Sequence, residues 1–317
     1  MDREIDGLVG DGPMVRYGFA QLMELDSGLA IGLSRMPADA LDWVPVTVGP
    51  DHHLVFSYVS QRVEFEGSGT KVVTPNEVVL CPSWQVYRRH DLYAVEEMTV
   101  FVAFTSECAA RIGVGDELTR GTARLGPAPT EALRDAWRLA HLLRHIDPGD
   151  RSDLDHVERG LRLVTATLPG VGQPNSGVAS RRPRTRRRHQ ELADAVREHL
   201  AVSFSDRTLP LERLAHEVGA APQHLARVFG AETGRSIHAY RTDLRLRFVL
   251  ARLPENEPLS DLAMEAGFAS PSHLSDVFRS RLGVSPSRLR SQLRRGWTRP
   301  GSDDSGTNLE AGRQRRT

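Results

Sequence analysis

The amino-acid sequence predicts a two-domain protein with a mostly β N-terminal half and an all-α C-terminal third. Short β segments follow one another between residues 51 and 104, and the segment 169–177, rich in glycine and proline, interrupts the apolar periodicity. Beyond that interruption, one helical pattern occurs twice. A chain of 317 residues also exceeds the size at which a single hydrophobic core usually stops growing. We therefore expect two cores of different architecture.

Charge divides the chain near the same place, although the formal net charge is zero. Residues 1–180 carry 16 Lys and Arg against 25 Asp and Glu, whereas residues 181–300 carry 22 against 13. A surplus of arginine in one segment is typical of a surface that binds a phosphate backbone. We therefore expect the two halves to have different partners.

The N-terminus and the cysteines exclude several classes of protein. The first residues are acidic where a signal peptide needs a basic segment, and no segment approaches the roughly 18 apolar residues of a membrane span. We expect a cytoplasmic protein with no membrane contact. Cys81 and Cys108 form no CxxC pair, so we expect buried free thiols and exclude a disulfide framework.

The N-terminal half contains two kinds of pattern. Five short segments have strand character, at 53–59, 61–66, 71–73, 78–80 and 98–104, and they predict a small barrel or sandwich. Helical spacing follows at 130–168. Its first face comprises Leu133, Trp137, Ala140 and Leu143, and its second comprises Leu154, Val157, Leu161 and Val164. We expect two helices that meet near residues 147–150.

The segment 169–190 is expected to be a linker. Its first part is rich in glycine and proline, and its second part is the basic segment Arg181–Arg188. A dense group of like charges repels itself unless it is solvated or lies against an anion. A flexible solvated linker is the favoured interpretation, and an additional phosphate contact is the alternative.

The C-terminal third contains an internal repeat. The segments 211–219 and 259–267 share leucine, alanine, glutamate and glycine positions at a shift of 48 residues. After the glycine the shift becomes 49, which pairs Leu225 with Leu274 and Phe229 with Phe278. Matches that resume in order after one insertion indicate two copies of one structural unit.

Each copy fits the requirements of a helix-turn-helix. A glycine ends the first helix, proline stands in the first turn of the second helix, and Ser270 supplies an N-cap in the second copy. The outer face of each second helix carries short polar residues suited to contact bases. The DNA-binding candidates are Gln223, His224, Ala226 and Arg227 in the first copy, and Ser272, His273, Ser275, Asp276 and Arg279 in the second.

A further helix is expected between the copies. Ile237, Tyr240, Leu244, Phe248 and Ala251 repeat at helical spacing. A helix of about 16 residues spans roughly 24 Å, which could hold two recognition helices near successive major-groove faces. The alternative is a packed helical subdomain with no DNA contact.

The repeat resembles the DNA-binding domain of the AraC/XylS family of transcription regulators. The resemblance covers residues 209–290 and rests on the patterns at 267–279 and 283–290. It implies two helix-turn-helix subdomains that contact adjacent major-groove faces of an asymmetric half-site. Two positions depart from the family pattern: Ala221 stands where serine is frequent, and Asp276 where arginine is common. The first recognition helix is therefore expected to lack a side-chain cap, and the second to bind weakly or to contact an unusual base, unless Asp276 pairs with Arg279.

The N-terminal half resembles the sensor half of the same family, a cupin-like barrel with a helical dimerisation segment. This resemblance rests on segment order and on the stretch 75–82. It implies a small-molecule effector in the barrel, a homodimer formed through residues around 130–168, RNA polymerase as a partner, and activation as the more common mode. The ligand-binding candidates are Trp43, Phe56, Tyr58, Trp84 and Tyr87, with His53, Arg88 and His90 as polar anchors. The same aromatic residues could instead form the core.

These expectations define four segments. Residues 1–168 form the sensing and dimerisation domain, 169–190 the linker, 191–295 the DNA-binding domain, and 296–317 a disordered tail. We expect no enzyme activity, no cofactor and no metal, because His52 and His53 point to opposite faces of a strand and no P-loop or GxSxG is present. Two alternatives stay open: a cupin-type enzyme tethered to a DNA-binding module, and a constitutive regulator without a ligand.

Overall fold

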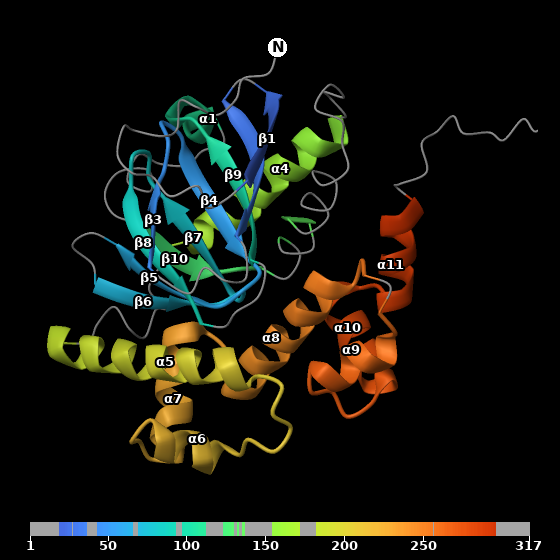
Figure 1. Cartoon of the computed structure of the whole chain (residues 1–317). Coiled ribbons are helices and arrows are strands. Elements are labelled where there is room, and N and C mark those ends of the chain that lie inside the picture. Colours follow the sequence, from blue (N-terminus) through green and yellow to red (C-terminus); the bar gives the residue numbers. More distant parts are fainter. Residues whose placement is uncertain are drawn as a thin grey trace, which may run out of the picture.

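The computed structural model describes residues 19–295 except 27, 37–42, 66–68, 93–96, 112–122, 130–131, 133–134, 137–153, 172–181 and 256. The β-rich N-terminal half lies against a helical C-terminal region (Figure 1). Among the described residues, no helix combines the length and apolar character needed to cross a membrane. The expected tail, residues 296–317, lies outside the described residues, and of the first expected helix in the segment 130–168 only residues 132, 135 and 136 are described.

The β-rich half consists of two antiparallel sheets, which confirms a mostly β architecture. The six-stranded sheet has the order β1 (Phe19–Asp26), β2 (Leu29–Met36), β9 (Glu97–Phe104), β4 (His52–Ser57), β7 (Glu77–Cys81) and β10 (Arg124–Pro127). The four-stranded sheet has the order β3 (Val44–Thr47), β8 (Val86–Asp91), β5 (Gln61–Phe65) and β6 (Gly69–Val73). The sheets are open and do not close into one continuous barrel.

Alternation along the strands explains why the sheets pack in layers. Val63 of β5 and Val79 of β7 belong to an apolar cluster between the two sheets. Neighbouring side chains such as Leu54 and Phe56 of β4 point to the other face of the six-stranded sheet and join a second cluster. Because both faces are covered, β7 is buried along its whole length.

Two helices cover the outer face of the six-stranded sheet. They are α1 (Ser106–Arg111) and α4 (Leu154–Thr167), which leads into the short 3-10 helix η2 (Leu168–Gly170). Leu163 and Val164 of α4 are buried in the same cluster as the strand residues. The second helix expected in the segment 130–168 is thus present, and one of its faces is occupied by the sheet.

The C-terminal region contains both expected helix-turn-helix units. The first consists of α6 (Leu211–Glu217) and α7 (Pro222–Thr233), and the second of α9 (Leu259–Glu265) and α10 (Pro271–Leu282). The connecting helix is α8 (Ile237–Arg252), which has the expected 16 residues. The flanking helices are α5 (Pro183–Ser203) and α11 (Pro286–Arg295).

Helix α5 corrects the expectation of a linker as far as residue 190. It begins at Pro183, because proline is tolerated in a first helical turn and arginine has a high helix propensity. Its buried stripe includes Ala193, Val196 and Leu200, which pack with Leu225 and Phe229 of α7 in the core of the first unit. This packing holds α5 in place, and the basic segment forms the N-terminal turns of the same helix.

Glycine ends the first helix of each unit, but the two glycines differ in their surroundings. Gly267 has a φ of +79°, and a Cβ at this position would lie 2.2 Å from the carbonyl oxygen of Ser205. Gly219 has a φ of +66°, and a Cβ there would meet no atom within 4 Å. Both positions need the left-handed conformation, but only the second copy also needs the absence of a side chain.

We therefore expect Gly267→Ala to destabilise the protein by about 2–3 kcal/mol, and Gly219→Ala by about 1 kcal/mol. The difference arises because alanine at position 267 adds a backbone collision to the conformational strain. Urea unfolding of the two full-length variants measures both values. Equal losses for the two substitutions would contradict the close approach of Ser205.

Candidate nucleic-acid interface

The outer face of α7 carries the first set of expected DNA contacts. Gln223, Ala226 and Arg227 are exposed, and His224 is half-buried. The Arg227 guanidinium lies 3.0 Å from His224 Nδ1, which orients the arginine along the helix surface. Ala221 makes no side-chain cap, as expected from the sequence.

The outer face of α10 carries the second set. Ser272, His273, Asp276 and Arg279 are exposed, and Ser275 is half-buried. The Ser270 hydroxyl accepts a hydrogen bond from the His273 amide at 3.1 Å, so the expected N-cap is present. Asp276 lies 3.8 Å from Arg279, an exposed pair that partly neutralises the carboxylate facing outward.

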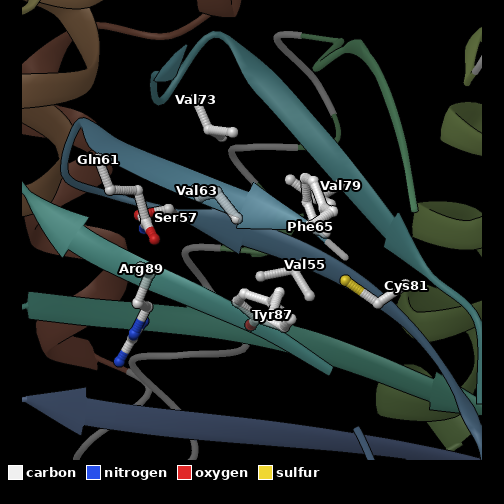
Figure 2. Close-up of a pocket in the computed structure, with 10 residues that line it drawn as sticks. All are labelled: Val55, Ser57, Gln61, Val63, Phe65, Val73, Val79, Cys81, Tyr87 and Arg89. Atoms are coloured by element: carbon white, nitrogen blue, oxygen red, sulfur yellow. Dashed lines mark hydrogen bonds between the residues drawn. The ribbon is translucent and has the colours of Figure 1, made fainter. Parts of the chain in front are cut away.

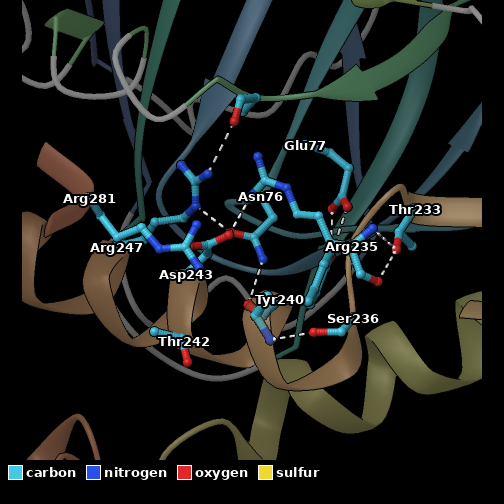
Figure 3. A network of polar contacts seen from close by, with 12 residues as sticks. Asn76, Glu77, Thr233, Arg235, Ser236, Tyr240, Thr242, Asp243, Arg247 and Arg281 are labelled. Atoms are coloured by element: carbon cyan, nitrogen blue, oxygen red, sulfur yellow. Dashed lines mark hydrogen bonds and ion pairs between the residues drawn. The ribbon is translucent and has the colours of Figure 1, made fainter. Parts of the chain in front are cut away.

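A buried carboxylate on α8 connects the two units. Asp243 is 3% exposed and forms an ion pair with Arg235, which follows α7. Its other oxygen lies 3.9 Å from Arg281 of α10 (Figure 3). One side chain on the connecting helix therefore has a cationic partner beside α7 and a second, more distant one in α10, so it favours one placement of the two units relative to each other.

The turn between β6 and β7 contacts the same helix. The Asn76 amide nitrogen donates to the backbone oxygen of Tyr240 at 2.9 Å, and Asn76 Oδ1 accepts from Arg247 (Figure 3). Arg247 also donates to the Ala128 oxygen at 3.2 Å. Burial lowers the pKa of Arg247 to about 10, and Asp243 opposes this shift, so the guanidinium stays charged at neutral pH.

Glu77 adds a second buried contact between the β-rich half and the helices. The Tyr240 hydroxyl donates to Glu77 Oε1 at 2.8 Å, and Arg197 of α5 lies 3.5 Å from the same oxygen. Burial opposes the charged form of Arg197, but Glu77, Tyr240 and Asp194 outweigh it and raise the pKa of the guanidinium. Burial also raises the pKa of Tyr240 well above its usual range. The hydroxyl therefore acts as a donor.

The residues that make these buried polar contacts were not among the site residues expected from the sequence. Asp243, Arg245 and Arg247 lie off the apolar stripe of α8, yet all three are buried. Hydrophobic spacing identifies the face of a helix that meets one core, and α8 is covered from several sides. The density of charged residues on a helix between two apolar units was the available signal.

A narrow cavity lies between the two sheets (Figure 2). Apolar side chains from both sheets line most of it, and Ser57, Gln61 and Arg89 gather at one end. Gln61 donates to the Ser57 hydroxyl at 2.7 Å. The cavity volume is about 20 Å³, which holds a water molecule and excludes a metabolite unless side chains move. Burial raises the pKa of the Cys81 thiol on its wall to about 12, so this cysteine is protonated.

Only one of the eight residues expected around a ligand, Tyr87, lines this cavity. Phe56 and Tyr58 are buried in the cluster on the outer face of the six-stranded sheet. Trp84 is 67% exposed, because it occupies a turn with a φ of +59° that directs it outward. His53 stacks on Phe101 with ring centroids 4.8 Å apart.

The remaining three candidates lie together, but away from the cavity. The ring centroids of Trp43 and His90 lie 5.7 Å apart, and the Arg88 guanidinium lies 5.5 Å from the Trp43 ring centroid. Arg88 also pairs with the Glu64 carboxylate, and its side chain is 55% exposed. This cluster sits on an exposed part of the four-stranded sheet rather than between the sheets.

The histidine pair in β4 has the opposed orientation expected from the sequence. His52 Nδ1 accepts from the Ser83 amide at 3.1 Å, and its Nε2 lies 2.9 Å from the Ser106 hydroxyl, whereas His53 stacks on Phe101. Burial lowers the pKa of both histidines, that of His53 to about 4. In the part of the chain that the structure describes, no three His, Cys, Asp or Glu side chains form a group that could hold a metal ion.

The lowered pKa of His53 predicts a pH dependence of stability. His53 binds a proton near pH 6.5 in the unfolded chain and near pH 4 in the folded chain. The contribution of neutral His53 to folding stability is therefore fully present above pH 6.5 and decreases as the pH falls toward 4. We expect the free energy of unfolding to be roughly 1–2 kcal/mol lower at pH 5 than at pH 7.5. Urea titrations at both pH values measure this. His53→Gln should remove most of the difference, and an unchanged pH profile in that variant would contradict the assignment.

Comparisons with known proteins match the helical region. A model of the helix-turn-helix domain family matches residues 214–292. The transcriptional activator RhaR of Klebsiella pneumoniae is 33% identical over 106 residues, which cover 33% of this chain and 37% of RhaR. The multiple antibiotic resistance protein MarA of Escherichia coli is 33% identical over 92 residues, which cover 29% of this chain and 72% of MarA.

A solved structure also matches this region. The C-terminal domain of AraT, a response regulator from Geobacillus stearothermophilus, is 25% identical, and the match covers 32% of this chain and 84% of that one with a TM-score of 0.31. This chain spans little more than a third of the length of RhaR.

Proposed function

The chain belongs to the AraC/XylS family of transcription regulators, and we propose that it binds one asymmetric DNA site with α7 and α10 in successive major grooves. The observation that supports this is the pair of exposed polar helix faces joined to one connecting helix through Asp243. Fixed spacing matters because two recognition helices increase affinity only when both reach their grooves at once. The residues proposed to contact DNA are those expected from the sequence: Gln223, His224, Ala226 and Arg227 of α7, and Ser272, His273, Ser275, Asp276 and Arg279 of α10.

We propose that a small molecule bound between the two sheets modulates DNA binding. The support is the lining of the cavity, which is apolar at Val63, Phe65 and Val79 and polar at one end, so that side-chain movements that enlarge the cavity would admit a small ligand with an apolar body and one polar end. The proposal extends to a homodimer formed through residues around 130–168, to activation through RNA polymerase, and to the cytoplasm as the compartment. It keeps residues 1–168 as the sensing and dimerisation domain, and it extends the expected DNA-binding domain, residues 191–295, back to the start of α5 at Pro183.

A constitutive regulator is the second candidate function, and the small cavity volume favours it. The melting temperature of the full-length chain in the presence of metabolites distinguishes the two functions. If an effector opens the cavity, a metabolite library should contain a compound that raises the melting temperature of the full-length chain. That rise should disappear in a Val79→Trp variant, which fills the cavity. A library with no stabilising compound would favour the constitutive regulator.

We expect Arg227→Ala to weaken binding by about 1–3 kcal/mol to a DNA site that the wild-type chain selects from a random pool. The reason is that Arg227 is exposed on α7 and its orientation is held by His224. Fluorescence anisotropy with the full-length chain measures the change. The control is Arg88→Ala, an exposed arginine of β8 that pairs with Glu64. Equal affinity of the Arg227 variant and the wild type would show that α7 is docked differently.

A further inference from the structure

The N-terminal turns of α5 form a concentrated basic surface, here called the arginine segment, Arg182–Arg188. Arg182, Arg184, Arg187 and Arg188 are exposed. Among the described residues, Arg187 pairs with Glu191 at 2.9 Å, and no ion pair is recorded for Arg182, Arg184 or Arg188. The first turn of the helix contains no acidic residue. The segment therefore carries positive charge that the fold does not neutralise.

A histidine contact places this segment beside the recognition helix. His189 follows the arginine segment directly and is 9% exposed, and its ring meets the His224 ring edge-on with centroids 5.8 Å apart. His224 lies in the first turn of α7, the end of a recognition helix that contacts bases. Arg227, the expected base or phosphate contact, is in turn held by His224.

Helix geometry gives the reach of the segment. At 1.5 Å per residue, Arg184 lies about 7 Å along the axis from His189, and the segment projects past α7 at the free end of α5 (Figure 1). A major groove is about 12 Å wide. An extended arginine beside the tip of a helix in that groove can therefore reach a bordering phosphate.

Electrostatics favours an occupant with many negative charges. Arg184 and Arg188 stand four residues apart on one helix, where like charges repel. The positive end of the helix dipole adds to this repulsion. Solvent screens this repulsion only in part, whereas a phosphate backbone neutralises the charges and releases counterions.

We propose that the arginine segment is a third DNA contact, which binds the phosphate backbone beside the groove entered by α7. This inference rests on the proposed function, because it needs α7 in a major groove. It assigns the segment no role in choosing the base sequence. It also extends the DNA interface beyond the two recognition helices on the side of the first unit.

The test uses the full-length chain with the substitutions Arg182→Gln, Arg184→Gln and Arg188→Gln together. The charge-matched control carries Arg88→Gln, Arg111→Gln and Arg124→Gln in the β-rich half. The probes are a duplex selected by the wild-type chain from a random pool and a duplex of random sequence. Affinity is measured for both probes between 0.05 and 0.3 M KCl, roughly the range where counterion release dominates.

The expected result is binding about 10- to 100-fold weaker for both probes at 0.15 M KCl, with the salt slope reduced by about two to three. The ratio between the two probes should stay at the wild-type value, and the control should match the wild type. A triple variant with wild-type slope and affinity would overturn the proposal, as would a changed ratio between probes. If the wild type itself does not distinguish the probes, the proposed function fails instead. Circular dichroism checks that α5 stays folded.

Discussion

Replacing Asp243 with alanine is expected to lower the free energy of unfolding by about 3–5 kcal/mol, because it leaves the half-buried Arg235 and the buried Arg247 without the nearby carboxylate. Arg235 loses its ion pair, and Arg247 loses the charge that opposes the lowering of its pKa. Arg281 loses its contact with α8 as well. Urea unfolding of the full-length chain measures the loss.

The same substitution is expected to weaken DNA binding by more than its effect on folding explains. Asp243 contacts both helix-turn-helix units, so its removal frees each unit to move relative to the other. Under conditions where the variant is fully folded, affinity for the complete selected site should fall at least about tenfold, while affinity for a duplex with one conserved block changes little. Asp243→Asn, which keeps an acceptor for Arg235, is the matched control and should lose less stability. Equal losses in the two variants would show that the negative charge, and not hydrogen bonding to Arg235, provides the stabilisation, and wild-type stability in both would contradict the account.

Glu77→Ala is expected to cost about 3–5 kcal/mol as well, because the carboxylate pairs with Arg197 in a buried environment. Its removal also leaves the Tyr240 hydroxyl without its acceptor, and the Thr74 amide without the oxygen that accepts from it at 2.9 Å. Hydrogen exchange should speed up in the turn before β7 and in the first half of α8. Urea unfolding gives the magnitude.

Glu77→Gln separates charge from hydrogen bonding at this position. The amide oxygen still accepts a hydrogen bond, so the variant should lose about 2 kcal/mol. A Glu77→Ala variant with wild-type stability and wild-type exchange in α8 would show that the Glu77 carboxylate does not help to hold the β-rich half and the helices together.

The sequence predicted the helical region well because its signals are local. The repeat at a shift of 48 placed both helix-turn-helix units, the spacing of Ile237 to Ala251 gave the connecting helix, and Ser270 was identified as a cap from its position before Pro271. Each of these depends on residues within a few turns of one another. Capping and periodicity act over the same distance.

The buried polar contacts could not be predicted in the same way. Asn76 meets Arg247 across 171 positions of the chain, and Glu77 meets Tyr240 across 163. No local pattern records which distant element covers a helix face. The ligand candidates had the same difficulty: Trp84 and Phe56 are both aromatic residues in a β-rich region, but a turn exposes the first and the core buries the second.

The basic segment illustrates a third case, in which two signals competed. Repulsion between arginines and the preceding glycines and prolines predicted a linker, whereas helix propensity and the buried stripe of α5 favoured a helix from Pro183. Packing of Ala193, Val196 and Leu200 against the first unit decides the outcome. Tertiary contacts beyond residue 190 therefore determine the structure of residues before it.

Selection of bound duplexes from a random pool by the full-length chain tests the central claim most directly. If α7 and α10 enter successive major grooves, the enriched sequences should share two different conserved blocks, centred roughly one helical turn apart. The Arg227→Ala variant should relax preference in one block only. Enriched sequences no different from the input pool would contradict the account.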